Sequence, residues 1–188
     1  YTMIHQNLRG GVAMISKRRG TANNKYMKEY YDPTKPTKCL LYVDTNNLHG
    51  WSMSQRLPDG KFKWVDEAEW ESIDWLAQTA DQDKGYIVEC DLDYPEELHD
   101  EHSDYPLAPE RTVVDTELLS AEQIEIDGKY QSTYVWSPKL VPNLFAKEKY
   151  ACHHMNLKFY LEHGMKLRKI HRVIVFHQSA WLAPYIGK

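Results

Sequence analysis

The sequence has few cysteines and no long apolar run. Three cysteines among 188 residues, odd in number and widely spaced, do not make the framework of a disulfide-stabilised secreted domain. We therefore expect free thiols in a reducing, intracellular compartment at Cys39, Cys90 and Cys152. No apolar run approaches the roughly 20 residues that span a bilayer, so we expect no membrane partner. The chain begins at Tyr1 without a methionine or a signal-peptide pattern, and we expect it to be a piece of a longer protein.

What remains is the composition of an ordinary globular protein. Hydrophobic residues make up 42% of the chain and charged residues 27%, which excludes an intrinsically disordered protein. A chain of 188 residues can bury one sizeable core and carry a small additional subdomain.

The charges are distributed unevenly along the chain. The net charge of −4 does not by itself predict nucleic-acid binding. Basic residues nevertheless gather near both ends, and acidic residues fill the segments 66–83 and 91–104 between them. Such a distribution suits a phosphate-binding cleft, whereas the plainer alternative is that each cluster is a solvated face. The basic residues concerned are Lys17, Arg18, Arg19, Lys25 and Lys28 in the first cluster, and Lys166, Arg168, Lys169 and Arg172 in the second.

The segment around Asp44 combines a strand pattern, a carboxylate and a helix start. Residues 39–43 are aliphatic, aromatic or β-branched and predict a buried strand that ends at Asp44. Residues 46–55 predict a short helix, whose unpaired N–H groups suit phosphate oxygens. A carboxylate at the end of a buried strand needs a cation or a donor, so Asp44 is a candidate ligand for Mg²⁺. The alternative is that Asp44 only caps the helix.

A second strand pattern, over residues 85–94, carries another pair of carboxylates. Asp91 and Asp93 share a strand face because side chains alternate with period two, and together they would suit a second cation. Just after them, His99 and His102 would share a face of a helix. Zinc binding there requires further ligands that the spacing does not supply, and the alternative is a solvated acidic loop.

The other patterns predict secondary structure and packing. Cys152, His153 and His154 fall inside a predicted helix, where neighbouring side chains diverge, so we expect them to pack rather than to chelate one ion. The predicted elements are a strand over 61–65, a helix capped by Asp66 with Trp70, Ile73 and Leu76 on its packing face, a loop-rich insertion over 105–142, a helix over 147–163 closed by Gly164, a strand over 169–176 and a helix over 179–186.

Several of these segments, taken in order, resemble a known enzyme family. Residues 42–50, Tyr-Val-Asp-Thr-Asn-Asn-Leu-His-Gly, resemble motif A of family B DNA polymerases, the Asp-x-x-Ser-Leu-Tyr-Pro signature at the end of a palm strand. Upstream, Leu-Arg-Gly-Gly at residues 8–11 resembles the Tyr-x-Gly-Gly segment of the protein-primed branch. The downstream succession of segments resembles the palm and insertion of polymerases carried by self-synthesising Polinton-type transposons and related virus-like elements.

The resemblance implies an α+β fold. A polymerase palm has a mixed or antiparallel sheet with helices on one face, here with a loop-rich insertion. The implied organisation is a pre-palm segment with the Gly-Gly motif and a linker over 1–38, palm with motif A over 39–104, the insertion over 105–142, and palm continuation over 143–188. The palm would be truncated before the helix that grips the nucleotide and before the second carboxylate motif.

The resemblance also assigns roles to residues of motif A. Asp44 would be a catalytic carboxylate that binds Mg²⁺, one part of a two-metal site, and the Thr45 carbonyl would bind the metal that accompanies the nucleotide. Asn47 and Leu48 would offer backbone N–H groups to the triphosphate of a dNTP. His49 stands where a tyrosine usually packs under the sugar, while Asn47 and Gly50 replace the usual serine and proline.

The implied partners are a DNA template-primer, a dNTP, the remainder of the polymerase chain and a terminal protein that primes synthesis. For a eukaryotic element, the nucleus is the expected compartment. The implied contacts to the DNA backbone come from the first basic cluster and the double glycine: Arg9, Gly10, Gly11, Lys17, Arg18 and Arg19.

Two other functions stay open from the sequence. Because the second carboxylate motif is missing, the fragment should be inactive alone, and it would equally suit a non-catalytic DNA-binding remnant of a transposon polymerase. An unrelated Mg²⁺-dependent nuclease would instead combine Asp44 with Asp91 and Asp93.

Overall fold

The structure is a computed structural model that describes residues 2–12, 14–17, 19–130 and 138–187. Its strands are β1 (Leu57–Val65), β2 (Lys84–Asp93), β3 (Glu110–Thr112), β4 (Lys139–Val141), β5 (Lys147–His153) and β6 (Lys166–Ser179). Its α-helices are α1 (Thr2–Gln6), α2 (Leu48–Ser54), α3 (Glu67–Trp70), α4 (His99–His102), α5 (Ala121–Tyr130), α6 (His154–Glu162) and α7 (Ala183–Ile186). Short 3₁₀ helices are η1 (Lys25–Tyr30), η2 (Glu96–Leu98) and η3 (Thr116–Leu118).

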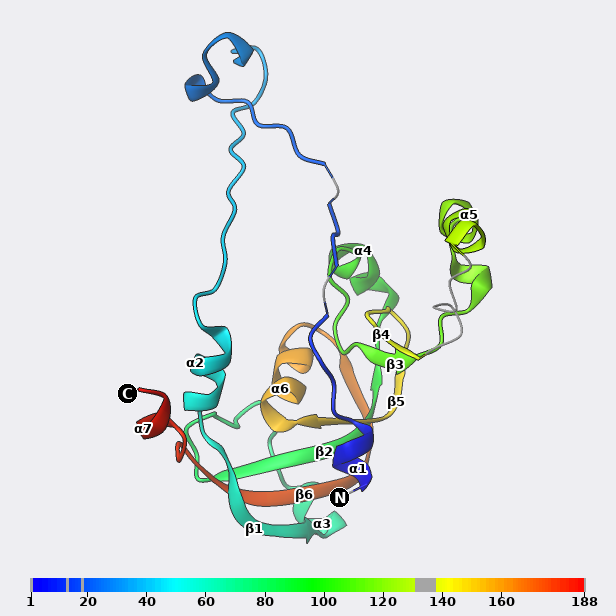
Figure 1. The fold of residues 1–188 in the computed structure, drawn as a ribbon. Helices are drawn as coiled ribbons and strands as arrows, with labels where there is room; N and C mark the ends of the chain where they lie inside the picture. Colours follow the sequence, from blue (N-terminus) through cyan, green and yellow to red (C-terminus); the bar gives the residue numbers. More distant parts are fainter. Residues whose placement is uncertain (1, 13, 18, 131–137, 188) are drawn as a thin grey trace.

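The main sheet is antiparallel and places its strands in the order β1-β6-β2-β5 (Figure 1). The long strand β6 therefore pairs with β1 on one side and with β2 on the other. The α+β class predicted from the sequence is confirmed, and the sheet is antiparallel rather than mixed. The predicted strands over 61–65, 85–94 and 169–176 are also confirmed as parts of β1, β2 and β6.

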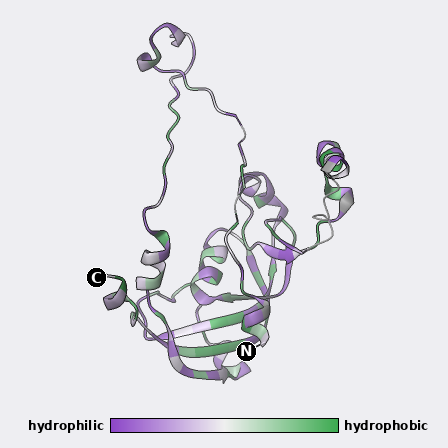
Figure 2. Ribbon diagram, viewed as in Figure 1, coloured by the Kyte–Doolittle hydropathy of each residue, from purple (hydrophilic) through white to green (hydrophobic). Residues whose placement is uncertain are grey.

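The two faces of the sheet carry different cores. Alternate residues of β2 and β6, such as Val88 and Val173, pack with Leu157 of α6 in the larger core. On the opposite face, Ile174 and Ala151 pack against Met3 of α1 in a smaller cluster. The prediction of helices on one face is therefore wrong, because α1 adds apolar contacts to the second face. In Figure 2, green hydrophobic stretches run along the strands of the main sheet.

Strand β1 forms one edge of the sheet and is longer than predicted. It begins at Leu57 and includes Pro58 and Gly60. Register shifts near Gly60, where φ is +150°, mark irregular pairing with β6. Proline and glycine are tolerated here because an edge strand has a free side and accommodates bulges.

The helix predicted to begin at Asp66 is only one turn long. Helix α3 ends at Trp70, and the Asp66 side chain makes no capping hydrogen bond. Trp70 and Ile73 still pack against the larger core, whereas Leu76 is exposed and Trp75 is buried in its place. The aromatic packing was thus predicted correctly, but the helical spacing was not.

The helix predicted over residues 147–163 is wrong in its first half. Residues 147–153 form β5, an edge strand paired with β2, and α6 begins only at His154. Cys152 and His153 therefore end a strand instead of lying inside a helix. Gly164 has a φ of +90° just after α6, as expected of a helix C-cap. The last predicted helix is reduced to α7.

The strand predicted at residues 39–43 is absent from the described part of the chain. These residues form an extended, unpaired segment in which Leu41 is 85% exposed and Tyr42 is 94% exposed. They belong to a long protrusion, made of residues 10–12, 14–17 and 19–46 of the described chain, that leaves the sheet region and returns to α2 (Figure 1). We call this protrusion the arm.

The predicted insertion contains more secondary structure than a loop. Within residues 105–142, β3 and β4 form a separate two-stranded antiparallel sheet, and α5 lies between them in sequence. Lys147 of β5 is fully buried and its ammonium group bonds to Glu110 of β3 at 3.0 Å and to the Asn143 carbonyl at 3.2 Å. This ion pair connects the β3–β4 sheet to the main sheet. Residues 131–137 lie outside the described part.

Candidate functional site

The Asp44 carboxylate lies in solvent at the base of the arm, directly before α2. One of its oxygens, Oδ1, accepts a hydrogen bond from the Thr45 N–H at 2.9 Å. Within the described residues, no side chain of another element bonds to it. Helix α2 itself packs against α7, which follows the sheet strand β6. Asp44 is therefore accessible to a ligand, but it is not at the end of a buried strand.

Asn47, rather than Asp44, caps helix α2. Asn47 adopts the left-handed conformation, with φ of 49°, and its Oδ1 accepts a hydrogen bond from the Gly50 N–H at 3.2 Å. A Cβ on Gly50 would come within 2.3 Å of the Asn47 side chain, which explains a glycine there. Leu48 and His49 are exposed at the first turn, where backbone N–H groups have no helical partner. The cap alternative for Asp44 is thus wrong.

The Arg9 side chain contacts other residues of the chain. Its guanidinium donates to the Ala151 carbonyl at 2.8 Å and to Asn7 Oδ1 at 3.0 Å, and it stacks 3.7 Å from the centroid of the Tyr150 ring. Asn7 Oδ1 also accepts from the Ala151 N–H at 3.4 Å. These side chains bond to the free edge of β5 as a neighbouring strand would. These contacts give Arg9 a structural role within the chain, and its predicted contact with DNA stays a prediction.

The other residues predicted to contact DNA lie in the arm. Gly10 and Gly11 lie in irregular chain, with open space where a Cβ would be. They do not make the tight turn that paired glycines permit. Lys17 and Arg19 are exposed farther along the arm, and Arg18 lies outside the described residues.

Two members of the second basic cluster, Arg168 and Arg172, are paired with carboxylates across the β2–β6 ladder. Arg172 makes two hydrogen bonds, of 2.6 and 2.7 Å, to the buried Glu89 carboxylate, which raises the pKa of the guanidinium. Arg168 lies 3.4 Å from Asp93 and 3.5 Å from Asp91. Arg168 and Arg172 thus pair with carboxylates of β2 instead of lining a phosphate-binding cleft.

Asp91 is held as a structural carboxylate. It accepts hydrogen bonds from the Lys149 N–H at 2.8 Å and from His171 at 2.7 Å. Burial works to raise the pKa of Asp91, but these two donors and Arg168 together hold it below its usual value. Asp91 lies near the far end of β2, about 23 Å along the strand from Lys84 at a rise of about 3.3 Å per residue.

Asp44 does not meet these carboxylates. Helix α2 packs on α7, beyond the C-terminal end of β6, where β6 pairs with the Lys84 end of β2. The described residues contain no group of three or more His, Cys, Asp or Glu side chains placed to hold a metal ion. His99 and His102 instead bond to Tyr94, through its carbonyl at 3.3 Å and its hydroxyl at 2.8 Å.

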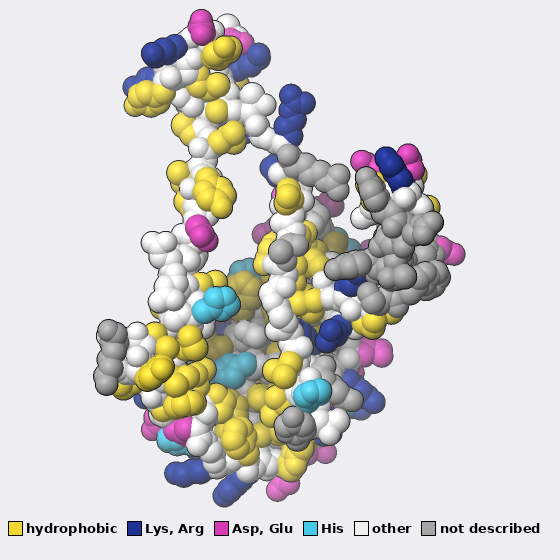
Figure 3. Space-filling view, in the orientation of Figure 1, with side chains coloured by type: hydrophobic (Ala, Val, Ile, Leu, Met, Phe, Trp, Pro, Cys, Tyr) yellow, Lys and Arg dark blue, Asp and Glu magenta, His cyan; other side chains and the backbone are white. Residues whose placement is uncertain are grey.

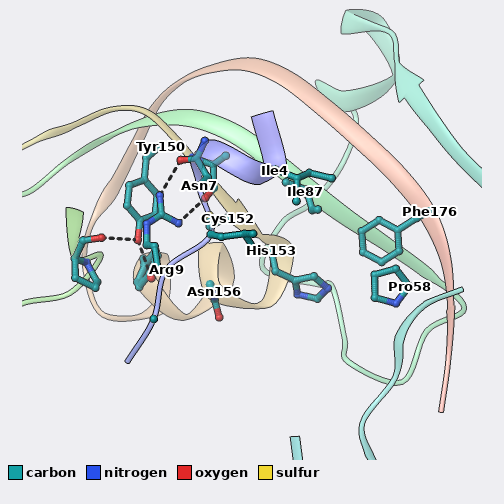
Figure 4. A pocket seen from close by; sticks show the side chains of 15 residues that line it. Ile4, Asn7, Arg9, Pro58, Ile87, Tyr150, Cys152, His153, Asn156 and Phe176 are labelled. Atoms are coloured by element: carbon teal, nitrogen blue, oxygen red, sulfur yellow. Dashed lines mark hydrogen bonds between the residues drawn. The ribbon is translucent and has the colours of Figure 1, made fainter. Parts of the chain in front are cut away.

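A cavity of about 410 Å³ lies between α1, β5 and α6 (Figure 4). Arg9 and Tyr150 close one end, Phe176 lines the other, and Asn156 and His153 supply polar groups. Burial and the neighbouring His154 lower the pKa of His153 to about 4, so its ring is neutral at pH 7. Its Nδ1 accepts from the Met155 N–H at 3.3 Å, which leaves the proton on Nε2.

His154 and the cysteines have structural surroundings. The fully buried His154 ring accepts from the Tyr86 N–H at 3.2 Å and contacts the Thr79 carbonyl at 3.4 Å. The predicted packing role of His154 is confirmed. Cys90 and Cys152 are buried on adjacent strands, where the neighbouring Cys152 thiol and burial raise the pKa of Cys90, whereas Cys39 is exposed on the arm.

Comparison with known proteins does not identify the chain. No family model matches it, and neither a curated protein nor a solved structure matches it. Among the described residues, no helix has the length and apolar character needed to cross a bilayer. Neither the cavity nor the contacts of Asn7 and Arg9 with β5 could be predicted from the sequence, because both depend on residues more than 140 positions apart.

Proposed function

We propose that this chain is the first part of the palm domain of a family B DNA polymerase of the protein-primed type. Within the longer protein it takes part in template-directed transfer of deoxynucleotides to a primer, and alone it is inactive. The observation that carries the proposal is the junction of Asp44 with α2. There a solvent-exposed carboxylate directly precedes a helix start at which Leu48 and His49 present backbone N–H groups.

The fold class is compatible with this proposal. A palm requires an antiparallel sheet that supports catalytic groups, and β1, β2, β5 and β6 form such a sheet. Residues of both proposed palm segments, 39–104 and 143–188, contribute strands to it. In the proposal, residues 39–43 form a strand only when the rest of the polymerase supplies a partner strand.

The donors at Asp44 fit part of a magnesium site. The Asp44 carboxylate and the Thr45 carbonyl are hard oxygen ligands of the kind that Mg²⁺ prefers. A second protein carboxylate has to come from outside the described residues, since none of these joins Asp44. When bound, the metal would neutralise charge on the triphosphate, and the residues of α2 would position its oxygens.

The test is primer extension by the longer protein, expressed from its complete reading frame. Asp44→Asn should reduce nucleotide incorporation at least 1,000-fold, because one ligand of the two-metal site loses its charge. Asp81→Asn, which removes an exposed carboxylate from a loop of the sheet region, is the matched control and should retain the parent's rate. Incorporation by Asp44→Asn at the parent's rate would refute the proposal.

The remaining candidates predict different results. A DNA-binding remnant requires a reading frame that stops soon after Lys188, without a downstream carboxylate hairpin. A nuclease requires Mg²⁺-dependent cleavage of DNA by the 188-residue chain. The structure weighs against the nuclease, because Asp91 and Asp93 are paired with Arg168 and are far from α2.

A further inference from the structure

The end of the arm is a compact, basic and aromatic loop, residues 23–38, which we call the basic loop. It lies far from the sheet, beyond two extended segments of the arm (Figure 1). Figure 3 shows dark blue cationic and yellow apolar side chains together at this end of the molecule. Because it protrudes, the basic loop can contact a large partner without obstruction by the sheet.

Asn23 closes the basic loop. Its backbone forms two hydrogen bonds with Lys38, of 2.8 and 2.7 Å. Its side-chain amide donates to the carbonyls of Asp32 at 3.0 Å, Lys35 at 3.2 Å and Pro36 at 3.1 Å, and its Oδ1 accepts from the Asp32 N–H at 2.9 Å. A loop closed in this way displays its side chains in a fixed arrangement, which lowers the entropy cost of binding.

Most of the positive charge on the basic loop is not neutralised within the described residues. Lys35 pairs with Asp32 at 2.9 Å. Hydrogen bonds from Thr34 and Lys35 lower the pKa of Asp32 to about 2, so its carboxyl group is ionised at any physiological pH. Lys25, Lys28 and Lys38 make no ion pair with a carboxylate, although Glu29 also lies on the loop. These three lysines differ in this respect from Arg168 and Arg172 of β6.

Exposed tyrosines lie between these lysines. Tyr26 is 80% exposed and Tyr30 is 77% exposed, and the Lys25 ammonium lies 5.3 Å from the centroid of the Tyr26 ring. Exposed aromatic rings beside cations that have no carboxylate partner suit a ligand with flat rings and negative charge. Bases that stack on aromatic rings and phosphates that pair with lysines combine both features in one ligand.

We propose that the basic loop binds single-stranded nucleic acid, with Tyr26 and Tyr30 stacking on bases and Lys25, Lys28 and Lys38 contacting phosphates. A single strand is favoured over a duplex because only unpaired bases expose faces for stacking. An anionic membrane is disfavoured because η1 is six residues long and has one aliphatic side chain, Met27, to insert into the acyl chains. The partner class is shared with the proposed polymerase function, but the surface is separate from Asp44 and from the double glycine.

The first test measures binding of the 188-residue chain to a fluorescent 12-nucleotide single-stranded DNA by anisotropy across a salt series. The triple variant Lys25→Gln, Lys28→Gln, Lys38→Gln should bind at least tenfold more weakly at 0.1 M salt. Its log–log salt slope should be smaller by about 2, at roughly 0.7 per lost phosphate contact. The matched control changes three exposed lysines of the sheet region and should bind as the parent does: Lys61→Gln, Lys63→Gln and Lys84→Gln.

The second test separates stacking from charge. Tyr26→Ala and Tyr30→Ala should each weaken binding about tenfold without changing the salt slope, while Tyr26→Phe should retain affinity. Tyr185 on α7 is as exposed as Tyr30, so Tyr185→Ala is the matched control. A simple loss of fold in any variant would be seen in its thermal unfolding.

The proposal fails if the control and the loop variants lose affinity equally, or if the parent does not bind the oligonucleotide. It also fails if the parent binds vesicles of phosphatidylserine and phosphatidylcholine through these lysines but not DNA. Primer extension by Asp44→Asn tests the polymerase proposal, and oligonucleotide binding by the loop variants tests this one, so the failure of either proposal is distinguishable from failure of the other.

Discussion

Strand β6 and the arm have similar composition but differ in their surroundings. Each combines a basic cluster with an apolar run: residues 166–176 in β6, and residues 17–43 in the arm. In β6 the arginines pair with carboxylates of β2 and the apolar residues fill both cores. In the arm, cations and apolar side chains are exposed. A basic or apolar cluster therefore indicates a binding surface only where the fold supplies no partner of its own.

The largest expected effect tests apolar burial. Phe176 of β6 is 1% exposed, so Phe176→Ala should lower the free energy of unfolding by about 3–4 kcal/mol. Tyr42→Ala, at an exposed site of the arm, should change it by less than about 0.5 kcal/mol. Urea denaturation of both variants measures the difference. A large effect of Tyr42→Ala would mean that the arm packs in solution.

A smaller effect is expected from the charges. Arg172→Met leaves the buried Glu89 carboxylate without its partner and should cost about 2 kcal/mol, less than for a fully buried pair because Arg172 is half exposed. Lys28→Met removes the same charge from the basic loop and should cost less than about 0.5 kcal/mol. Equal losses in denaturation experiments would contradict the contrast between the two clusters.

The third effect depends on pH. Because the pKa of His153 is about 4 in the folded state and about 6.5 when unfolded, the unfolded chain binds the proton more readily. Its contribution to stability is complete above pH 6.5 and is lost as the pH falls towards 4, about 2 kcal/mol between pH 7.5 and pH 5. Denaturation at both pH values measures this, and His153→Gln should reduce the loss. The protection of the Asn23 and Lys38 amides in the basic loop against hydrogen exchange should not show this loss as the pH falls.

The sequence predicted the elements that follow from local pattern. Strands β2 and β6 were found because their apolar runs are strong and bounded by turns, and α2 because a polar residue precedes a short apolar pattern. The prediction of a strand at residues 39–43 was wrong because an apolar run does not reveal whether a partner strand is present. Residues 147–153 were predicted as helix from their local pattern. That prediction was wrong because pairing with β2 overrides local propensity.

Features of the candidate site also differ in whether they follow from local sequence or from contacts between distant residues. The start of α2 could be predicted from the sequence, since its signals lie within one short segment. The exposure of Asp44 could not, because the apolar run before it predicted a buried strand. The neutralisation of Asp91 by Arg168 and His171 could not, because those residues are about 80 positions away and meet only through strand register. The same holds for Arg9, whose contacts lie on β5.

The position of β6 at the centre of the sheet also determines when the sheet can form. Its pairing partners β1 and β2 precede it by more than 70 residues, so each pairing closes a long loop. A sheet built from such distant contacts is expected to fold in milliseconds to seconds rather than microseconds. During synthesis, β1 and β2 leave the ribosome without a central strand and expose unpaired apolar edges. Newly made chains that stop before Lys166 are therefore expected to depend on a chaperone and to aggregate without one.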